Sequence, residues 1–194
     1  AAVIAVIGIG SSAEKALEAS IDELGPRTLS IFPSQRKRGG ISSGFNPLVI
    51  KDAEALAKNN EHNWLIAPAM SGNRQVKFLN SNVSGEINGY LPVNFKVRGF
   101  DIGLGRLFTE KENLGRKKVI VLGSKVPGEL NTTARQILDK EIFVAGTAYK
   151  VVGILEEEGS TGWQNPDDDF YVPLLTASQR ILGTERLGLS LIHI

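Results

Sequence analysis

The sequence has no cysteine and very little histidine. The absence of cysteine excludes disulfide bonds, zinc–thiolate sites and thiol nucleophiles. The two histidines, His62 and His193, lie far apart without the spacing of a metal-binding motif, so we expect no metal site. An excess of one charge is lacking as well. The formal net charge is +1, which gives no overall field that would attract nucleic acid, and no nucleic-acid partner is expected.

A complete membrane-spanning segment is also missing, since such a helix needs about 20 apolar residues. The chain opens with AAVIAVIGIG, which is apolar and uncharged. No initiator methionine and no basic segment precede this run, so it is not a complete signal peptide. Two interpretations stay open. The run is a buried first strand, or residues 1–9 are the end of a transmembrane helix that begins upstream.

The composition is that of a folded globular protein, with 42% hydrophobic and 22% charged residues in 194. Before residue 73, helical spacing alternates with short β-rich runs and punctuating glycine and proline. The elements expected there are a helix over 11–24, a strand over 28–32, a Gly/Ser-rich surface loop over 34–47, a helix over 50–58 and a strand over 64–70. Pro68 places this last strand at a sheet edge or a bulge.

From about residue 73 the residue pattern is mostly typical of short β-strands. The expected strands cover 75–79, 83–87, 93–97, 119–122, 142–144 and 149–155, with a short helix near 125–130. The tail predicts a strand over 170–173, a helix over 177–182 and a strand over 187–194. Helices thus flank a β-rich centre, and the fold class predicted is α+β.

One motif indicates a different function. Gly8 to Ala13 spells G-x-G-x-x-A after an apolar run and before a helix, the context of a dinucleotide-binding loop. Arg36 and Arg38 follow at a distance that suits a 2′-phosphate. A Rossmann-type, NADP-binding oxidoreductase is therefore the alternative function. The β-rich middle argues against it, because a doubly wound sheet needs regular alternation of strands and helices.

Two further patterns have plain structural interpretations. Gly40 to Gly44 spells G-x-S-x-G, but no strand is expected before Ser42 and no helix after it, as a nucleophile elbow requires. The acidic runs Glu156–Glu158 and Asp167–Asp169 lack the ligand spacing of a calcium loop, so we expect a solvated hairpin tip. The sequence assigns no catalytic, cofactor-binding or metal-binding residue, and no cofactor.

Several segments form an ordered set along the chain. They are IDELGPRTLSIFPS (21–34), LVIKDAEAL (48–56), INGYLPVNFKV and GLGRLFTE (within 87–110), VIVLG (119–123), GTAYKVVGIL (146–155) and DFYVPLLTASQRILG (169–183). In this order they resemble the periplasmic core domain of MacB-type ABC transporter permeases, which lies between the first and second transmembrane helices. The chain departs from the family at Asp139, where a glycine is usual, and the family continues beyond residue 194.

The resemblance implies a division of the fold. Porter-like βαβ units would form a discontinuous subdomain from residues 10–72 and 170–194. A mainly β insert, like the sabre subdomain of the family, would occupy residues 73–169. Residues 1–9 would be the end or remnant of a transmembrane helix, with this domain on the periplasmic or extracellular side of the cell (inner) membrane.

The resemblance also implies a role without catalysis. Such a domain couples ATP hydrolysis in a cytoplasmic domain, absent from this chain, to export or efflux by mechanical transmission. The implied partners are a periplasmic adaptor (membrane fusion) protein, a second copy in the full-length permease, and an ATP-binding subunit or domain reached through the membrane part. Lipoprotein release and cell-wall regulation are alternatives within the family. Trp163 and Asn165, in the Gly-rich hairpin, are the candidate partner-binding residues.

Overall fold

The computed structural model describes residues 28–33, 35–38, 41–45, 47–159 and 165–193. The expected helix over 11–24 and the segment 1–9 lie outside these ranges. One sheet has nine strands, and β2 and β3 form a second. The strands are β1 (Thr28–Ile31), β2 (Gln35–Arg38), β3 (Ile41–Phe45), β4 (Leu65–Phe78), β5 (Ser81–Tyr90), β6 (Ile102–Gly105), β7 (Val119–Leu122), β8 (Glu141–Val144), β9 (Thr147–Leu155), β10 (Phe170–Pro173) and β11 (Leu189–His193).

The helices are short and connect or cover the strands. They are α2 (Ile50–Lys58), α3 (Pro92–Arg98), α4 (Glu110–Leu114), α5 (Val126–Glu129), α6 (Ala134–Ile137), the single 3₁₀ turn η1 (Pro166–Asp168), α7 (Leu174–Thr176) and its π-helical continuation η2 (Ala177–Leu182). Across the described ranges, every helix falls short of the length and apolar character that crossing a membrane requires. The chain therefore has a mixed architecture of helix and strand.

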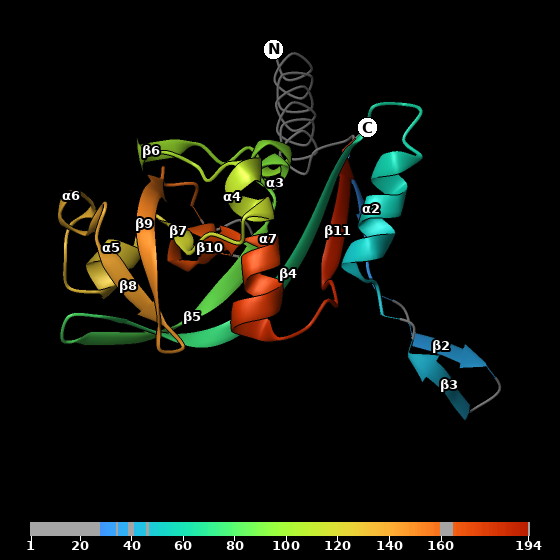
Figure 1. The fold of residues 1–194 in the computed structure, drawn as a ribbon, viewed down its shortest axis with the longest axis horizontal. Coiled ribbons are helices and arrows are strands. Elements are labelled where there is room, and N and C mark those ends of the chain that lie inside the picture. Colours follow the sequence, from blue (N-terminus) through green and yellow to red (C-terminus); the bar gives the residue numbers. More distant parts are fainter. Residues whose placement is uncertain (1–27, 34, 39–40, 46, 160–164, 194) are drawn as a thin grey trace, which may run out of the picture.

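Strand β4 is the longest strand of the described sheet. It has 14 residues and pairs with β11 near its start, with β5 from Ala69 onward, and with β8 near its end. Strand β1 adds to the other side of β11, with Leu29 opposite Ile192, so segments from the two ends of the described chain lie side by side. Figure 1 shows β4 running from β11 to the hairpin at the far end of the molecule. It passes through residue 73, where the sequence texture changes, without interruption.

Six of the strands close into a ring. From β4 the pairing passes to β5, β10, β7, β9 and β8, and β8 pairs with β4 again. Only β5–β10 and β7–β9 are parallel among these pairs. Alternate side chains fill the interior, among them the fully buried Val76, Ile87, Ile120, Tyr149 and Phe170. Closure leaves none of the six strands with a free edge at these pairings, so the ring resists slippage.

A second apolar cluster covers the outer face of the sheet. Phe95 of α3 packs against Tyr90, Phe108 and Tyr171, with ring centroids 5.4 to 5.8 Å apart. Strand β7 contributes to both clusters, since Val119 and Val121 face this outer one while Ile120 and Leu122 face the ring interior. Burial on both faces explains why VIVL is apolar at every position.

Residues 93–97 lie in helix α3, so the predicted strand is wrong. Pro92 occupies the first turn, where its missing N–H costs nothing, and Asn94 accepts a hydrogen bond from the Leu91 N–H (2.9 Å). Gly99 ends the helix with φ of 73°. Five alternating residues span little more than one helical turn, which is too short to separate a period of 2 from one of 3.6.

The predicted surface loop over 34–47 is also wrong in part, because it contains the antiparallel pair β2–β3. Arg38 lies opposite Ile41, so two residues connect the strands. The sequence carries a signal for this hairpin, since Gly39 and Gly40 are the dipeptide typical of a two-residue connection.

The prediction that Pro68 places its strand at a sheet edge or a bulge is wrong for the strand as a whole, because β4 lies between β11 and β5. Pro68 lies in β4 opposite Ser190 of β11, and pairing with β5 begins only at Ala69. On the β5 side the Pro68 carbonyl instead accepts a hydrogen bond from the Asn94 amide (3.0 Å). Proline is tolerated here because this stretch of β4 is paired with a strand on one side only.

The ring predicts a packing-sensitive glycine. A Cβ atom at Gly85 of β5 would lie 2.3 Å from Cε2 of Phe170, a fully buried ring with little room to move. Gly85→Ala should therefore lower the free energy of unfolding by about 1–3 kcal/mol in urea denaturation. The matched control is Gly128→Ala, since a Cβ atom there meets nothing within 4 Å. An equal loss in both variants would contradict the packing described.

Candidate functional site

The segment GLGRLFTE forms the turn from β6 to α4. Gly105 has φ of 83°, and a Cβ atom on it would lie 2.5 Å from the Val152 carbonyl oxygen. The next residue, Arg106, donates its backbone N–H to that same oxygen (2.9 Å). Glycine is needed because a left-handed conformation and this close approach to β9 both exclude a side chain. The turn thereby fixes where the Arg106 side chain begins.

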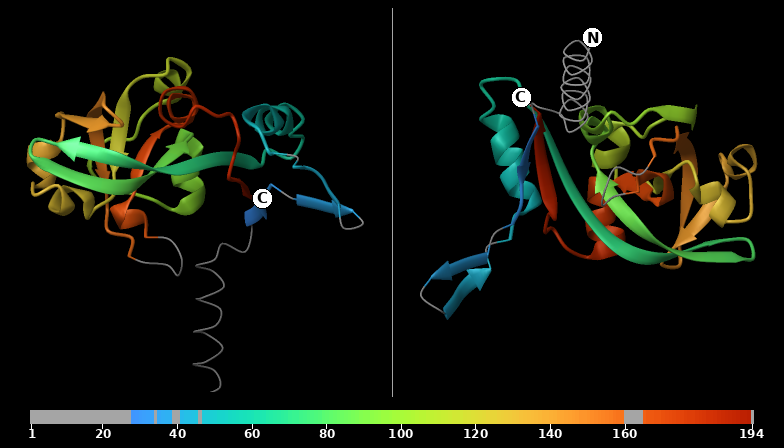
Figure 2. Two further views of the ribbon diagram at one scale, coloured as in Figure 1. Left: turned by 90° about the horizontal axis from the view of Figure 1, so that it is seen from below. Right: turned by 180° about the vertical axis from the view of Figure 1, so that it is seen from behind.

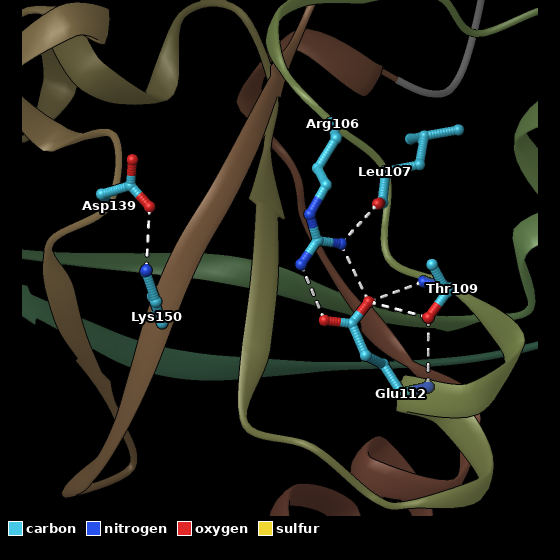
Figure 3. A network of polar contacts seen from close by, with 6 residues as sticks. All are labelled: Arg106, Leu107, Thr109, Glu112, Asp139 and Lys150. Carbon is cyan, nitrogen blue, oxygen red and sulfur yellow. Dashed lines mark hydrogen bonds and ion pairs between the residues drawn. The ribbon is translucent and has the colours of Figure 1, made fainter.

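Arg106 and Glu112 form a two-point ion pair across the turn (Figure 3). The guanidinium donates to the two carboxylate oxygens at 2.9 and 2.8 Å, and also to the Leu107 carbonyl at 2.9 Å. The carboxylate accepts further hydrogen bonds from the Thr109 backbone N–H (2.8 Å) and hydroxyl (3.0 Å). Thr109 in turn caps α4 by accepting from the Glu112 N–H, which completes a capping box. We call these contacts the Arg106–Glu112 clamp.

The clamp holds its charges fixed at neutral pH. The hydrogen bonds from Arg106, and secondarily those from Thr109, lower the pKa of Glu112 to about 2 against the opposing effect of burial. The same contact raises the pKa of Arg106. Neither group can exchange a proton near pH 7, so the clamp is structural and unsuited to general acid–base catalysis.

A hollow of about 480 Å³ opens beside the clamp, lined by Gly105, Arg106, Glu112, Val119, Leu138, Asp139, Lys150 and Val152. A second ion pair, Lys150 Nζ to Asp139 Oδ1 at 2.9 Å, lies across it (Figure 3). The hollow therefore has two cations and two carboxylates, and each charge already has a partner. Such a lining presents little net charge to an anion, and its carboxylates are occupied by cations rather than available to a metal.

Asp139, where the resemblance implies a glycine, has a backbone conformation that glycine also favours. It has φ of 62°, in the left-handed region that glycine prefers and aspartate tolerates better than most residues. Its N–H donates to the Val151 carbonyl (2.9 Å), and its carboxylate forms the ion pair with Lys150. The turn that leads into β8 is thus formed by Asp139.

Asp167 corrects the prediction of a solvated acidic tip. Its side chain is only 1% exposed. The carboxylate accepts hydrogen bonds from Lys125 Nζ (2.9 Å) and from the backbone N–H groups of Glu158 (3.0 Å) and Gly159 (3.2 Å). Burial raises the pKa of Asp167, but the Lys125 and Glu158 contacts outweigh it and the pKa is lowered overall. Asp167 therefore fastens the segment after β9 to the start of α5.

The pKa of Asp169 is shifted in the opposite direction to that of Asp167. Asp169 is partly buried, and its carboxylate accepts a hydrogen bond from the Asn88 amide (3.0 Å). Burial, followed by repulsion from Glu86 and Asp168, raises its pKa to about 7, although Asn88 and Arg98 act against the shift. The acidic run thus contains one aspartate held ionised by a cation and one whose charge is disfavoured. Sequence alone does not separate them.

The structure describes one of the two candidate partner-binding residues. Trp163 lies outside the described residues. Asn165 is partly buried, and its amide donates to the Asp168 carboxylate. Its Oδ1 atom is buried and has no hydrogen-bond partner within the described ranges. Asn165 is therefore oriented by the acidic run, just before η1.

Among the residues that the structure describes, no three histidine or acidic side chains gather as a metal site would require. His62 stacks on Trp64 with ring centroids 5.2 Å apart, and His193 Nδ1 lies 3.3 Å from the Thr28 hydroxyl. Ser42 lies within β3, opposite Lys37 of β2, and not at a strand-to-helix turn. One signal in the sequence was missed. Thr109 and Glu112 have the spacing of a capping box, which indicates the helix cap that forms part of the clamp.

The clamp turn, the apolar β7 and the β8–β9 pair coincide with segments of one family. The model of the MacB-like periplasmic core domain matches residues 1–192. The chain belongs to this family. The match includes Gly8–Ala13, and the described strands form a mainly antiparallel sheet, so the dinucleotide-binding interpretation loses its support.

Curated relatives are ABC-type export permeases of greater length. The chain is 30% identical over 186 residues to the macrolide export ATP-binding/permease protein MacB of Bdellovibrio bacteriovorus. The aligned region covers 94% of this chain and 28% of that protein. The MacB protein of Chlorobaculum tepidum gives the same identity and coverage. The chain thus spans less than a third of the length of these relatives.

Solved structures show the same fold. The periplasmic region of MacB from Actinobacillus actinomycetemcomitans matches with a TM-score of 0.71 and 22% identity, over 90% of this chain and 77% of that one. The extracellular domain of the noncanonic ABC-type transporter YknZ from Gram-positive bacteria matches with a TM-score of 0.70 and 17% identity, over 86% and 82%. At these identities the likeness concerns the fold alone.

The clamp makes stability depend on acid pH. Because the folded-state pKa of Glu112 lies below its unfolded value, its contribution is present above about pH 4.5 and is lost as pH falls toward 2. Arg106 is half exposed, so we expect Glu112→Gln to lower the free energy of unfolding by only about 1 kcal/mol at pH 7. Unfolding in urea at pH 7 and pH 3 measures the gap. The control is Glu110→Gln in the same helical turn, and a gap that does not shrink at pH 3 contradicts the clamp.

Asp169 predicts the reverse trend. Its folded-state pKa is raised to about 7, so the protonated form stabilises the fold at low pH and this contribution fades as pH rises from about 4 through 7. Asp169→Asn keeps an acceptor for Asn88 and removes the charge. It should raise the melting temperature at pH 8 by several degrees, equivalent to about 1 kcal/mol after allowing for solvent screening, and by less at pH 5. A larger gain at pH 5 would show that the sign is wrong.

Proposed function

We propose that this chain is the extracytoplasmic domain of an ABC transporter permease and couples ATP hydrolysis elsewhere in that transporter to export. The observation that carries the proposal is the family match over residues 1–192. The described residues add support of a different kind: their strongest charge pairs serve turns and helix caps, and none is arranged around a reactive group. The domain acts as a rigid, non-catalytic part of the machine.

The proposed layout has two parts that share one sheet. Residues 10–72 and 170–194 form a porter-like subdomain with βαβ units, residues 73–169 form the sabre-like β insert, and residues 1–9 are the end of a transmembrane helix. Strands β1 and β11 at one end of β4, and the closed ring toward the other, support this division, but β10 of the porter-like part pairs with β5 and β7 inside the ring. The domain lies on the outer side of the cytoplasmic membrane, as the family description implies.

Movement passes along β4 in this proposal. A strand of 14 residues is about 45 Å long. Its hydrogen bonds to β11, β5 and β8 oppose bending or sliding, since either change would break pairs in a closed ring. A displacement applied at β11 is therefore carried to the distal hairpin without a hinge in between.

The proposed partners follow from the family. They are an adaptor protein, a second copy of the permease, and the ATP-binding subunit or domain reached through the membrane. The cargo is a drug-like compound, because the relatives carry the name of macrolide exporters; lipoprotein release or cell-wall regulation is the alternative. Trp163 and Asn165 are proposed contacts of the adaptor, and the Asn165 amide donates to the Asp168 carboxylate.

The test uses the full-length permease reconstituted in lipid with its purified adaptor. We expect the adaptor to bind and to stimulate ATP hydrolysis, and Trp163→Ala to weaken adaptor binding about tenfold or more, as loss of an aromatic interface anchor does. Basal ATP hydrolysis should not change. The matched control is Trp64→Ala, since Trp64 is 38% exposed and precedes β4 at the other end of the strand.

Two outcomes count against the proposal. If the adaptor neither binds the wild-type permease nor stimulates it, the proposed function is wrong. If Trp163→Ala leaves adaptor affinity unchanged while the variant stays folded, this loop is not a contact.

A further inference from the structure

A row of polar side chains crosses the outer face of the ring where β5 meets β10 (Figures 1 and 2). Ile87 of β5 pairs with Phe170 of β10, and both side chains are fully buried in the ring interior. Because side chains alternate along an extended chain, Glu86, Asn88 and Asp169 lie on the opposite, outer face. The Asn88 amide donates to the Asp169 carboxylate (3.0 Å), so these two side chains are in contact.

The charges around Asp169 are mostly of its own sign. The titratable and charged groups that lie around it on the packed elements are Glu86 and Tyr90 of β5, Asp167 and Asp168 of η1, Tyr171 of β10 and Arg98 at the end of α3. Arg98, the cation of this group, also lies over the Tyr90 ring, 5.3 Å from its centroid. An ionised Asp169 therefore adds a charge where carboxylates already outnumber cations.

The backbone at Asp169 joins two parts of the molecule. The Asp169 carbonyl accepts a hydrogen bond from the Gly123 N–H (2.8 Å), and the Asp167 carbonyl accepts one from the Lys125 N–H (3.0 Å). A Cβ atom at Gly123 would lie 2.3 Å from the Asp167 carbonyl oxygen. The turn η1 is thus packed directly on the backbone that follows β7, and Asp169 is the residue between η1 and β10.

Two aspartates hold this turn in different ways. The contact with Lys125 keeps the pKa of Asp167 low, so its anchor is the same on both sides of neutral pH. Burial and the repulsion from Glu86 and Asp168 instead raise the pKa of Asp169 to about 7. One anchor of η1 is therefore constant near neutral pH, whereas the other gains or loses a proton there.

We propose that Asp169 is a proton-controlled joint, which holds η1 firmly on β5 and the end of β7 while its carboxyl is neutral and loosens η1 when it is ionised. Ionisation places a negative charge beside Glu86 and next to Asp168, so the carboxylates repel one another across the joint. The neutral carboxyl keeps the hydrogen bond from Asn88 without this repulsion. Such a joint makes the order of the segment before β10 depend on pH, whatever partner the domain has.

Nuclear magnetic resonance of the isotope-labelled chain tests the joint. Between about pH 5.5 and 8.5, the signals of the Asn88 side-chain amide and the Gly123 backbone N–H should shift with a midpoint near 7. Asp169→Asn keeps an acceptor for Asn88 and removes the titrating group, so these shifts should disappear. Glu86→Gln removes one repelling charge, so it should keep the shifts and lower their midpoint.

Hydrogen exchange of the Gly123 and Lys125 amides shows whether the turn itself loosens. After correction for the intrinsic effect of pH on exchange, their protection in the wild type should fall about three- to tenfold from pH 6 to pH 8. In Asp169→Asn the protection should stay the same within about twofold, because no charge appears at the joint.

The matched control is Glu141→Gln, because Glu141 is an exposed carboxylate of β8, a strand that does not pair with β10. It should leave the midpoint and the protection unchanged. A midpoint near 7 that persists in Asp169→Asn belongs to another group, such as His62 or His193, and overturns the proposal. Equal protection of the wild type at the two pH values overturns it as well, because the carboxyl then titrates without loosening η1.

Discussion

The structure depends on the pairing of β4 with three different strands. Near its start β4 is held by β11, in the middle by β5, and near its end by β8, which closes the ring. Each pairing fixes which side chains face inward, because a shift of one residue would turn Val76 and Phe78 outward and Lys77 into the core. The ring interior, the outer aromatic cluster and the clamp turn all take their places from this register.

Much of the strand content follows from local patterns in the sequence. VIVL predicts β7 with its exact bounds because both of its faces are buried, and GTAYKVVGIL predicts β9. The ring closure does not follow, since β8 meets β4 across more than sixty residues of chain and only tertiary packing selects that partner. The same limit explains α3, where a short alternating run takes the helical form once Pro92, Asn94 and Gly99 fix its ends.

The polar sites are less predictable than the fold, because their behaviour depends on neighbours distant in sequence. Asp167 and Asp169 look equivalent in DDD, yet Lys125 holds one ionised while Glu86 and burial disfavour the charge of the other. The helix cap within the clamp could be predicted, because Thr109 and Glu112 have capping-box spacing. The ion pair could not, because its partner Arg106 belongs to the preceding turn. The positive φ of Leu79 could not be predicted from its residue type, because leucine rarely adopts this conformation.

We infer from these features that the domain moves as one rigid body, and its rigidity can be measured directly. Cysteine is absent from this chain, so labels can be introduced at chosen positions within it. Spin labels at Ser30 in β1 and Asn82 in β5 of the full-length permease report the distance between the two ends of the sheet by pulsed electron resonance. The account predicts one distance that changes by no more than about 2 Å, the scale of shear between packed elements, with and without ATP. A second, separate distance population in either state would show a hinge within the domain and contradict it.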